Sequence, residues 1–569
     1  MMKNVITFLM CTLCILTGMA QADLNGNGMI IPERTPELQA LYLQSKQLEI
    51  KGTAAEINAN RLAIKAAWEQ VDPAVAALYK PIETTGVGPT MVEREINPDQ
   101  AQPISRAPED WSTDLLLREG YIDGLDMDVA GNGDIYIAAY ENYVGSGFDD
   151  SVTYIYRSTD GGNSFVLWKE NLVISSELSK IQLISMDGNG VDYLLLYELF
   201  DNGQFTVARW KMSSGDFDFD PVASSITDFS VDRNYTLDTS AQRVFATYQK
   251  SDQITYSARS TAGSYGFDWV DEFRFGIVGE QIDFAYGLNG GCYTTFIGFN
   301  SKNLKAMENS SFNDPASWSS AVNLTDSSIT EVINPTIRAA RLEMSNDKVI
   351  IWASQRPTGS SEGYDGLGMK RVNGANYINF SGFPAGGSQW SIAQTDSWVR
   401  KVNGSEEIRL SYVRDNIPNN ENDVNRSLTF NGTDFDPFEP VADTSVNVFE
   451  GFSSAIAETS DGLPCMAFAG TSGSDGYNLY FDAKSTLGIE ENSLDGFTFY
   501  PNPAQDIINI SAKSTVEKIG IYSLLGQEVM QLSPEQKSPS LNVSSLASGV
   551  YVMKVEVDGQ IGTYKIIKK

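Results

Sequence analysis

The sequence predicts a mainly β fold made of a repeated four-stranded unit, and three observations predict it. A turn rich in Asp, Asn and Gly followed by an apolar strand recurs seven times, with strands starting at 135, 193, 244, 292, 349, 408 and 465. The intervals cluster around roughly 50 to 60 residues, the size of one four-stranded blade. Helical periodicity is confined to residues 34–80. Together these features predict a seven-bladed β-propeller over residues 105–486, with an N-terminal helical segment and a C-terminal β-sandwich.

The best copy of the repeat runs from Asp128 to Trp168. Its turn, 128–134, leads into the apolar strand 135–140 and then into a third strand at 152–156. Corresponding third strands are expected at 205–210, 254–258, 304–307, 367–372, 426–430 and 478–481, and first strands at 121–127, 180–184 and 281–286.

The seventh copy lacks an outer strand, because the chain turns polar and leaves after residue 481. The missing strand is expected at the front of the domain, where residues 108–116 (PEDWSTDLL) resemble residues 315–324 (PASWSSAVNL), an outer strand by its place in the repeat. Residues 111–117 are therefore predicted to complete the last blade. Closure by both ends of the chain would hide an edge that otherwise invites aggregation.

The first 22 residues have the features of a secretory signal peptide. Lys3 is followed by the apolar stretch 5–16 and by the small residues of Ala20-Gln21-Ala22, so the mature chain is expected to begin near Asp23. Residues 23–30 resemble the start of a calcium loop, but position twelve is Arg34 instead of an acid, which favours a flexible polar terminus. Export through the periplasm is the prediction.

Residues 23–80 are expected to form a short helical segment, followed by a linker at 81–104. Thr35-Pro36 provides a cap and first turn, Gly52 ends the first helix, and Thr53 with Glu56 forms a capping box for the second. Asp72-Pro73 would start a third, short helix. Packing of this segment against its neighbours is preferred over a docking or pro-segment role.

The composition excludes several classes of function. A formal charge of −32 without a long acidic run argues against nucleic acid and anionic membranes, which need basic patches. The absence of histidine removes Ser-His-Asp and Cys-His catalysis and imidazole ligands. No catalytic, metal-binding or cofactor-binding residue is assigned, and no cofactor and no transmembrane segment are expected. Cys292 and Cys465 fall in equivalent strands of non-adjacent copies, so two buried thiols are predicted instead of a disulfide.

The turn that ends the first copy fits S-x-D-x-G-x-x-F, with Ser158, Asp160, Gly162 and Phe165. This is the Asp-box motif, and here the sequence resembles sialidase-like, BNR-type propellers. The resemblance implies that these four residues are structural, forming a hairpin turn away from any site. Residues 260–267 and 311–318 are degenerate copies that keep only the Ser and the aromatic ends.

Residues 495–569, after a linker at 487–494, have turn-separated alternation that predicts a small antiparallel sandwich. The segments FTFYPNPAQD, IGIYSLLGQEV and LASGVYVMKV closely resemble the type A C-terminal sorting domain of type IX (Por) secretion substrates of the Bacteroidetes. The resemblance implies export across the inner membrane, recognition of this domain by the type IX machinery, and release from the cell or attachment to its surface.

Three hypotheses about function follow, the third of which is a scaffold that assembles partner proteins. The first is a secreted, non-catalytic module that binds carbohydrate or protein; candidate contact aromatics are Trp269, Tyr364, Trp390 and Trp398. The alternative is a sialidase-like glycoside hydrolase, a family that uses a tyrosine, a carboxylate and three arginines. The family's Arg-Ile-Pro motif is absent, since only Leu-Arg-Glu-Gly occurs at 117–120. Four arginines are worth locating, although none matches a family motif: Arg118, Arg274, Arg338 and Arg400.

Overall fold

The structure is a computed structural model with two compact units, residues 1–484 and 485–569, and each is described by itself. The expected signal peptide lies outside the described residues. These are 31–84, 89–96, 102–105, 111, 114–142, 150–188, 191–234, 238–252, 254–287, 291–309, 318–325, 328–339, 347–357, 366–373, 376–380, 390–402, 405–416, 421–430, 439–441, 454–471, 476–484, 494, 497–502, 504–523, 528–547, 549–557 and 559–569.

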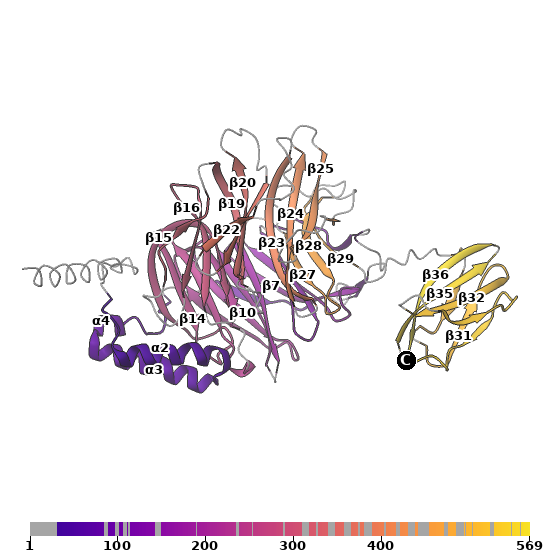
Figure 1. The fold of residues 1–569 in the computed structure, drawn as a ribbon, viewed down its shortest axis with the longest axis horizontal. Helices are drawn as coiled ribbons and strands as arrows, with labels where there is room; N and C mark the ends of the chain where they lie inside the picture. The colour runs from indigo at the N-terminus through magenta and orange to yellow at the C-terminus, as the bar shows by residue number, and fades with distance from the viewer. Residues whose placement is uncertain are drawn as a thin grey trace, which may run out of the picture. The chain divides into compact units, whose positions relative to one another are not determined.

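Three helices precede the strands in the described part of the first unit, and their ends follow the capping signals of the sequence. Helix α2 (Pro36–Lys51) starts where the Thr35 hydroxyl accepts a hydrogen bond from the Leu38 N–H, and Gly52 ends it. Helix α3 (Ala54–Val71) has the predicted capping box, with Thr53 and Glu56 bonded reciprocally. The short helix α4 (Pro73–Ala76) follows. Figure 1 shows α2 and α3 lying side by side.

A buried ionic network attaches these helices to the strands. Asp271 accepts hydrogen bonds from Arg61 of α3 and from Arg259, and neither Asp271 nor Arg259 is exposed. Glu49 of α2 pairs with the fully buried Arg243. Charges are this deeply buried only when they are paired. The helical segment is therefore packed as an integral part of the first unit.

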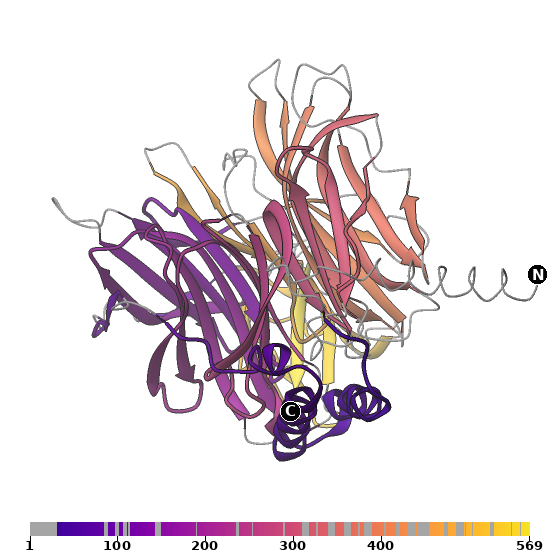
Figure 2. The ribbon, with the colours of Figure 1, turned by 90° about the vertical axis from the view of Figure 1, so that its left-hand side faces the viewer.

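The strands of the first unit form antiparallel sheets (Figure 2). The first has the order β1-β7-β6-β5-β4, with β2 also on β7: β1 Thr90–Glu93, β2 Ile104–Ser105, β4 Gly124–Val129, β5 Ile135–Asn142, β6 Ser151–Ser158, β7 Ser164–Ile174. The second has the order β11-β10-β9-β8: β8 Leu178–Gly188, β9 Val191–Phe200, β10 Phe205–Lys211, β11 Phe217–Ala223. The segment expected as a linker thus contributes two short strands, β1 and β2, that extend the first sheet.

The third sheet is longer, because one strand takes part in two groups. Its strands follow one another in chain order from β12 to β18, and the short 3₁₀ helix η1 (Thr239–Ala241) lies in the connection between β12 and β13. The strands are β12 Ile226–Arg233, β13 Val244–Lys250, β14 Ile254–Ser260, β15 Trp269–Tyr286, β16 Cys292–Gly298, β17 Leu304–Asn309 and β18 Val322–Asn323. The 18-residue strand β15 pairs with β14 through its first part and with β16 through its second.

Three further sheets complete the first unit. They are β19-β20-β21-β22, β23-β24-β25-β26 and β27-β28-β29-β3: β19 Ile329–Ala339, β20 Asp347–Pro357, β21 Gly366–Asn373, β22 Asn376–Phe380, β23 Trp390–Val402, β24 Ser405–Asn416, β25 Glu421–Phe430, β26 Glu439–Pro440, β27 Ser454–Glu458, β28 Pro464–Gly470, β29 Asn478–Ala483, β3 Leu115–Arg118. Within the predicted segment 111–117, Leu115 and Leu116 pair with β29, and Trp111 packs beside the same sheet.

The repeat places its strands as the sequence predicts. The apolar strands expected at seven positions are β5, β9, β13, β16, β20, β24 and β28, and the expected third strands are also present. Strands β16 and β28 are buried at every position, because a neighbouring sheet covers each face. The first strands contact one another in the order β4, β8, β12, β15, β19, β23, β27, and β27 contacts β4.

The second unit contains two sheets around one apolar core. One has the order β30-β31-β34 and the other β33-β32-β35-β36: β30 Thr498–Tyr500, β31 Ile507–Ser511, β32 Val516–Ser523, β33 Glu528–Leu532, β34 Ser540–Asn542, β35 Gly549–Val557, β36 Gln560–Lys568. The core of this unit includes Ile508, Ile519, Met553 and Ile566. Alternation of inward apolar and outward polar residues explains the sandwich.

Candidate functional site: a pocket among the first strands

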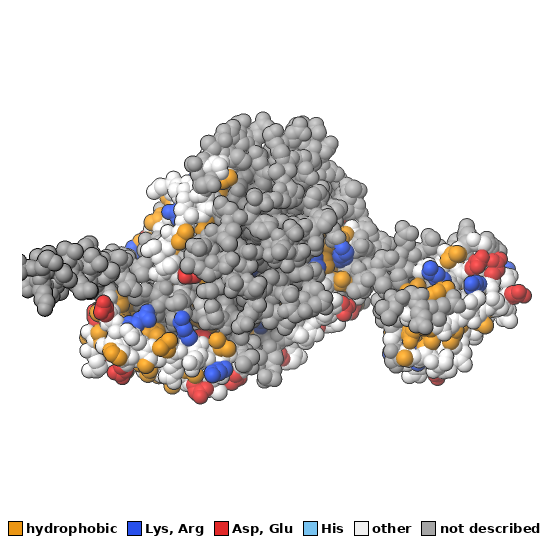
Figure 3. Space-filling view, viewed as in Figure 1, with side chains coloured by type: hydrophobic (Ala, Val, Ile, Leu, Met, Phe, Trp, Pro, Cys, Tyr) orange, Lys and Arg blue, Asp and Glu red, His pale blue; other side chains and the backbone are white. Residues whose placement is uncertain are grey.

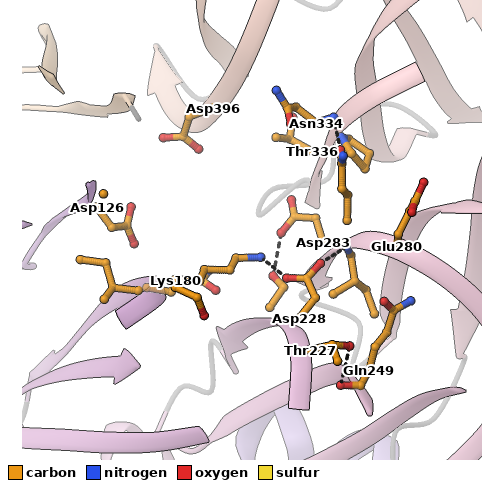
Figure 4. A pocket seen from close by; sticks show the side chains of 18 of the residues that line it. Asp126, Lys180, Thr227, Asp228, Gln249, Glu280, Asp283, Asn334, Thr336 and Asp396 are labelled. Atoms are coloured by element: carbon orange, nitrogen blue, oxygen red, sulfur yellow. Dashed lines mark hydrogen bonds and ion pairs between the residues drawn. The ribbon is translucent and has the colours of Figure 1, made fainter. Parts of the chain in front are cut away.

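The seven first strands surround a pocket with a volume of about 770 Å³. Its lining residues lie at or near the first residues of β4, β8, β12 and β27 and in the middle of β15, β19 and β23. This volume lies in the range of sites for small molecules and oligomers. Figure 4 shows its carboxylates converging from different strands, with Asp126 and Asp396 on one side and Glu280 on the other.

Backbone irregularities occur at the level of the pocket in five of these strands. Register shifts lie at 178/180 in β8, 226/228 in β12, 280/283 in β15, 333/336 in β19 and 393/395 in β23. Gln281 and Asn334, which line the pocket, have φ values of 52° and 50°. A bulge re-aims the side chains that follow it, and such strain concentrates at functional sites. The sheet edges are therefore shaped around this cavity.

Side chains of one first strand accept hydrogen bonds from the backbone of the next. First strands of adjacent sheets do not pair with each other, so their inward N–H groups need other acceptors. The acceptors and donors are Asp126 Oδ2 and Leu183 N (2.7 Å), Gln182 Oε1 and Val231 N (3.0 Å), Asp228 Oδ2 and Ile282 N (2.7 Å), Ser230 Oγ and Phe284 N (3.1 Å), Asp283 Oδ2 and Ile337 N (2.8 Å), and Asp396 Oδ2 and Ile456 N (2.9 Å). These bonds hold neighbouring sheets in register.

These residues were not predicted from the sequence, although the sequence contains a signal for them. The partners are separated by 57, 49, 54, 54, 54 and 60 residues, which is the period of the repeat itself. Asp126, Asp283 and Asp396 stand at matching places in their copies. Aligning the copies at the first strands, instead of at the more apolar second strands, would have found them.

Among the lining residues that the structure describes, acidic side chains outnumber basic ones. The acids are Asp123, Asp126, Asp228, Glu280, Asp283 and Asp396, and the bases are Lys180 and Arg338. Lys180 Nζ lies 2.7 Å from Asp228. Arg338 donates to Asp283 at 3.1 Å and to Asp396 at 2.9 Å. Burial would lower the pKa of Arg338, but these two carboxylates outweigh it and its pKa is raised.

Asp126 differs from the other carboxyl groups in its proton affinity. Burial, and then the nearby charge of Asp396, raise the pKa of Asp126 to about 8. At neutral pH this carboxyl group therefore keeps its proton and can donate a hydrogen bond. The pocket thus combines one protonated acid, Asp126, with the Asp396 carboxylate, which forms an ion pair with Arg338.

The four arginines singled out from the sequence do not meet at the pocket in the described part of the chain. Arg338 lines it. Arg118 instead binds Glu141 at 3.0 Å and the Tyr154 hydroxyl at 2.6 Å, where β3 meets β5 and β6. Arg274 lies 4.0 Å from Asp252. The side chain of Arg400 lies outside the described residues.

Of the four candidate aromatic residues, the structure describes only the side chain of Trp269. Trp269 is 5% exposed and donates from Nε1 to the Gly266 carbonyl, so it is a core residue. Tyr364 and the side chains of Trp390 and Trp398 lie outside the described residues. Among the described aromatic residues, Tyr140 and Phe299 line the pocket. Neither stood out from the many strand aromatics in the sequence.

The turn with Ser158, Asp160, Gly162 and Phe165 lies after β6 and does not line the pocket. Ser158 Oγ accepts from the Gly162 N–H at 2.9 Å, and Asp160 accepts from the Ser164 N–H at 2.9 Å. Burial would raise the pKa of Asp160, but hydrogen bonds from Ser164 and Ser158 outweigh it and lower the pKa. Phe165 is fully buried against Phe481, with ring centroids 4.6 Å apart.

Neither cysteine belongs to the pocket. Cys292 in β16 and Cys465 in β28 are both buried, and no disulfide joins these two described residues. Within the described residues, no three Asp, Glu, Cys or His side chains are grouped as a metal site. Among the helices that the structure describes, none combines the length and apolar content of a membrane span.

Comparison with known proteins identifies the second unit. Residues 498–569 match the secretion system C-terminal sorting domain, which confirms a type IX sorting tail. Such a tail directs a protein to secretion or to the cell surface. The sequence matches no curated protein.

Solved structures resemble the chain only distantly. AofleA from Arthrobotrys oligospora is 11% identical, with 65% of this chain and 90% of that chain covered and a TM-score of 0.36. A Trypanosoma rangeli sialidase in complex with sialic acid is 10% identical, covering 84% and 88%, with a TM-score of 0.35. A Penicillium chrysogenum α-L-arabinanase complexed with arabinobiose is 12% identical, covering 56% and 98%, with a TM-score of 0.37. Resemblances this weak define no ligand.

Proposed function

We propose that the chain is an exported seven-bladed β-propeller that binds a neutral or amine-bearing carbohydrate in its central pocket, without catalysis. Seven blades are supported by the order of the sheets, in which β15 serves two four-stranded groups, and by β3 completing the group of β27–β29. A signal at 1–22, passage through the periplasm and a sorting domain at 495–569 belong to the same proposal.

The observation that carries this proposal is the pocket itself. It is concave and about 770 Å³ in volume, which suits a small oligomer better than a flat protein surface. Hydroxyl and amide groups of Ser179, Thr227, Gln249 and Asn334 stand in its lining and can bind sugar hydroxyls. Tyr140 and Phe299 offer apolar contacts.

The charge of the lining narrows the ligand class. Among the described lining residues, ionised acids outnumber bases even with Asp126 protonated, and Arg338 is engaged by two of those acids. An anionic sugar would bring like charge into this field, whereas a neutral or amine-bearing sugar would not. This weighs against sialic acid as the ligand.

Glycoside hydrolysis is the second candidate, and one observation favours it. Burial raises the pKa of Asp126 to about 8, while Asp396 forms an ion pair with Arg338. A protonated and an ionised carboxyl group facing one sugar are the acid and the base or nucleophile of many glycoside hydrolases.

One pair of assays separates the two functions. Binding of the full chain to an array of neutral, amino and acidic glycans is measured first, followed by hydrolysis of the bound glycans. The proposal expects neutral or amino glycans to bind without turnover. Turnover that disappears in both Asp126→Asn and Asp396→Asn would establish the hydrolase instead. Binding confined to acidic glycans would contradict the assignment of the ligand class.

A further inference from the structure

Two exposed tyrosine rings lie together near the pocket. Tyr121 is 58% exposed and Tyr477 39% exposed, and their ring centroids are 6.3 Å apart at an interplanar angle of 82°. Single exposed apolar residues are common on proteins, but adjacent exposed rings held in a fixed geometry mark a contact surface. We call this pair the tyrosine platform.

The backbone holds the platform rigidly. Residues 121 and 477 form a parallel bridge, in which the Ile122 N–H donates to the Tyr477 carbonyl and the Tyr477 N–H donates to the Gly120 carbonyl, both at 2.8 Å. The platform therefore lies where the residues just before β4 pair with the residue just before β29. Because the backbone on both sides is already fixed, it loses little conformational entropy when a ligand binds.

Each tyrosine follows a glycine that permits this close approach. A Cβ on Gly120 would lie 1.9 Å from Glu141 Oε1, whose carboxylate is held by Arg118. A Cβ on Gly476, which has φ of +142°, would lie 2.7 Å from the Gly120 carbonyl oxygen. The two Gly-Tyr steps thus bring both rings to one place.

The platform adjoins the pocket lining. Ile122 is only 2% exposed, so its side chain points into the core. Tyr121 and Asp123, on either side of it, are both exposed. Asp123 lines the pocket. A ligand seated in the pocket can therefore continue over Asp123 onto the rings.

We infer that the tyrosine platform is a second subsite, which stacks one ring of an oligosaccharide whose other residues occupy the central pocket. This inference rests on the proposed function and specifies the ligand as an oligosaccharide instead of a single sugar. The apolar face of a pyranose suits an exposed aromatic ring, and the tyrosine hydroxyl can meet its hydroxyls. The alternative occupant, a protein segment, becomes an outcome of the test.

The test measures how affinity depends on ligand length. The full chain is titrated calorimetrically with gluco-, xylo-, manno- and N-acetylglucosamine oligosaccharides of one to six residues. In at least one series, affinity should rise with length by on the order of 10-fold. In Tyr121→Ala and Tyr477→Ala this gain should be lost, as for a buried interface aromatic, while affinity for the shortest ligand is unchanged. Tyr121→Phe should retain the gain, because the ring is kept.

Tyr500→Ala, which truncates a tyrosine that is 62% exposed in the second unit, is the matched control and should change nothing. If short sugars bind but length adds no affinity, or if the alanine variants keep the gain, the subsite is refuted and the proposed function stands. If no sugar binds to the wild type, the proposed function fails. If the wild type binds a protein ligand, and Tyr121→Ala and Tyr477→Ala both lose that binding but keep the binding of sugars, the oligosaccharide subsite is refuted and the platform is assigned to a protein.

Discussion

Replacing Asp271 with Asn should release the helical segment from the strands. The Asp271 carboxylate is fully buried and accepts from Arg61 Nε at 2.6 Å and from Arg259 Nη2 at 2.6 Å. Asn keeps the size of the side chain, and it tolerates the φ of 60° found at this position. The substitution therefore tests the charge with little change in shape.

The expected loss follows from the burial of both cations. Breaking a buried ion pair costs about 3–5 kcal/mol, because the remaining charge is left without a partner. Asp218→Asn is the control: Asp218 pairs with Arg209 at 2.8 Å, but its side chain is 61% exposed. Such a surface pair contributes about 0–1 kcal/mol. Figure 3 shows charges of both signs mixed on the visible face of the helical segment.

Hydrogen exchange followed by mass spectrometry provides the assay. Amides in the peptide that spans α3 report the free energy of local opening. Asp271→Asn should speed their exchange by roughly 100- to 5,000-fold, the range that corresponds to 3–5 kcal/mol. Exchange in the second unit should not change. Equal effects of Asp271→Asn and Asp218→Asn would refute the reasoning.

Two further predictions concern a turn and the effect of pH. Gly162→Ala should cost about 1–3 kcal/mol or more in unfolding, because φ is +90° and the new Cβ would lie 2.9 Å from Phe481. Gly161→Ala, with φ of +73° and no neighbour within 4 Å, should cost less; equal losses would contradict the packing argument. Burial raises the pKa of Asp126 and of Glu198 to about 8, so the native state keeps two protons that the unfolded chain releases near pH 4. Stability should therefore fall as pH rises from 4 to 8, by up to about 1.4 kcal/mol per pH unit and group. In Asp126→Asn and in Glu198→Gln, the slope of stability against pH should become less steep. An unchanged slope would contradict the claim that these two carboxyl groups cause the fall in stability.

The sequence predicted the strand positions well because the period is long and repeats seven times. Strand starts at 135, 244 and 292 are observed at those residues, since turn chemistry and apolar runs mark them locally. It did not predict that β15 runs through residues 269–286 as one strand, because no turn separates the part that pairs with β14 from the part that pairs with β16.

The candidate site was much less predictable than the fold. Arg338 was one of four arginines named from the sequence, but Asp126, Asp283 and Asp396 were not recognised. Their partners lie one whole repeat away, so no local pattern marks them. The tyrosine platform was also missed, because its rings come from residues 121 and 477, which meet only where the ends of the domain come together.

Blocking the central pocket tests the proposed site most directly. Ser251 lies in an exposed turn after β13 and lines the pocket, so Ser251→Trp should fill part of the cavity without disturbing a strand. Ser214→Trp, in an exposed turn that does not line the pocket, is the control. By calorimetric titration with the glycan that the wild type binds, Ser251→Trp should weaken binding at least about 10-fold and Ser214→Trp should not. Undiminished binding by a folded Ser251→Trp protein would contradict the assignment of the ligand to this pocket.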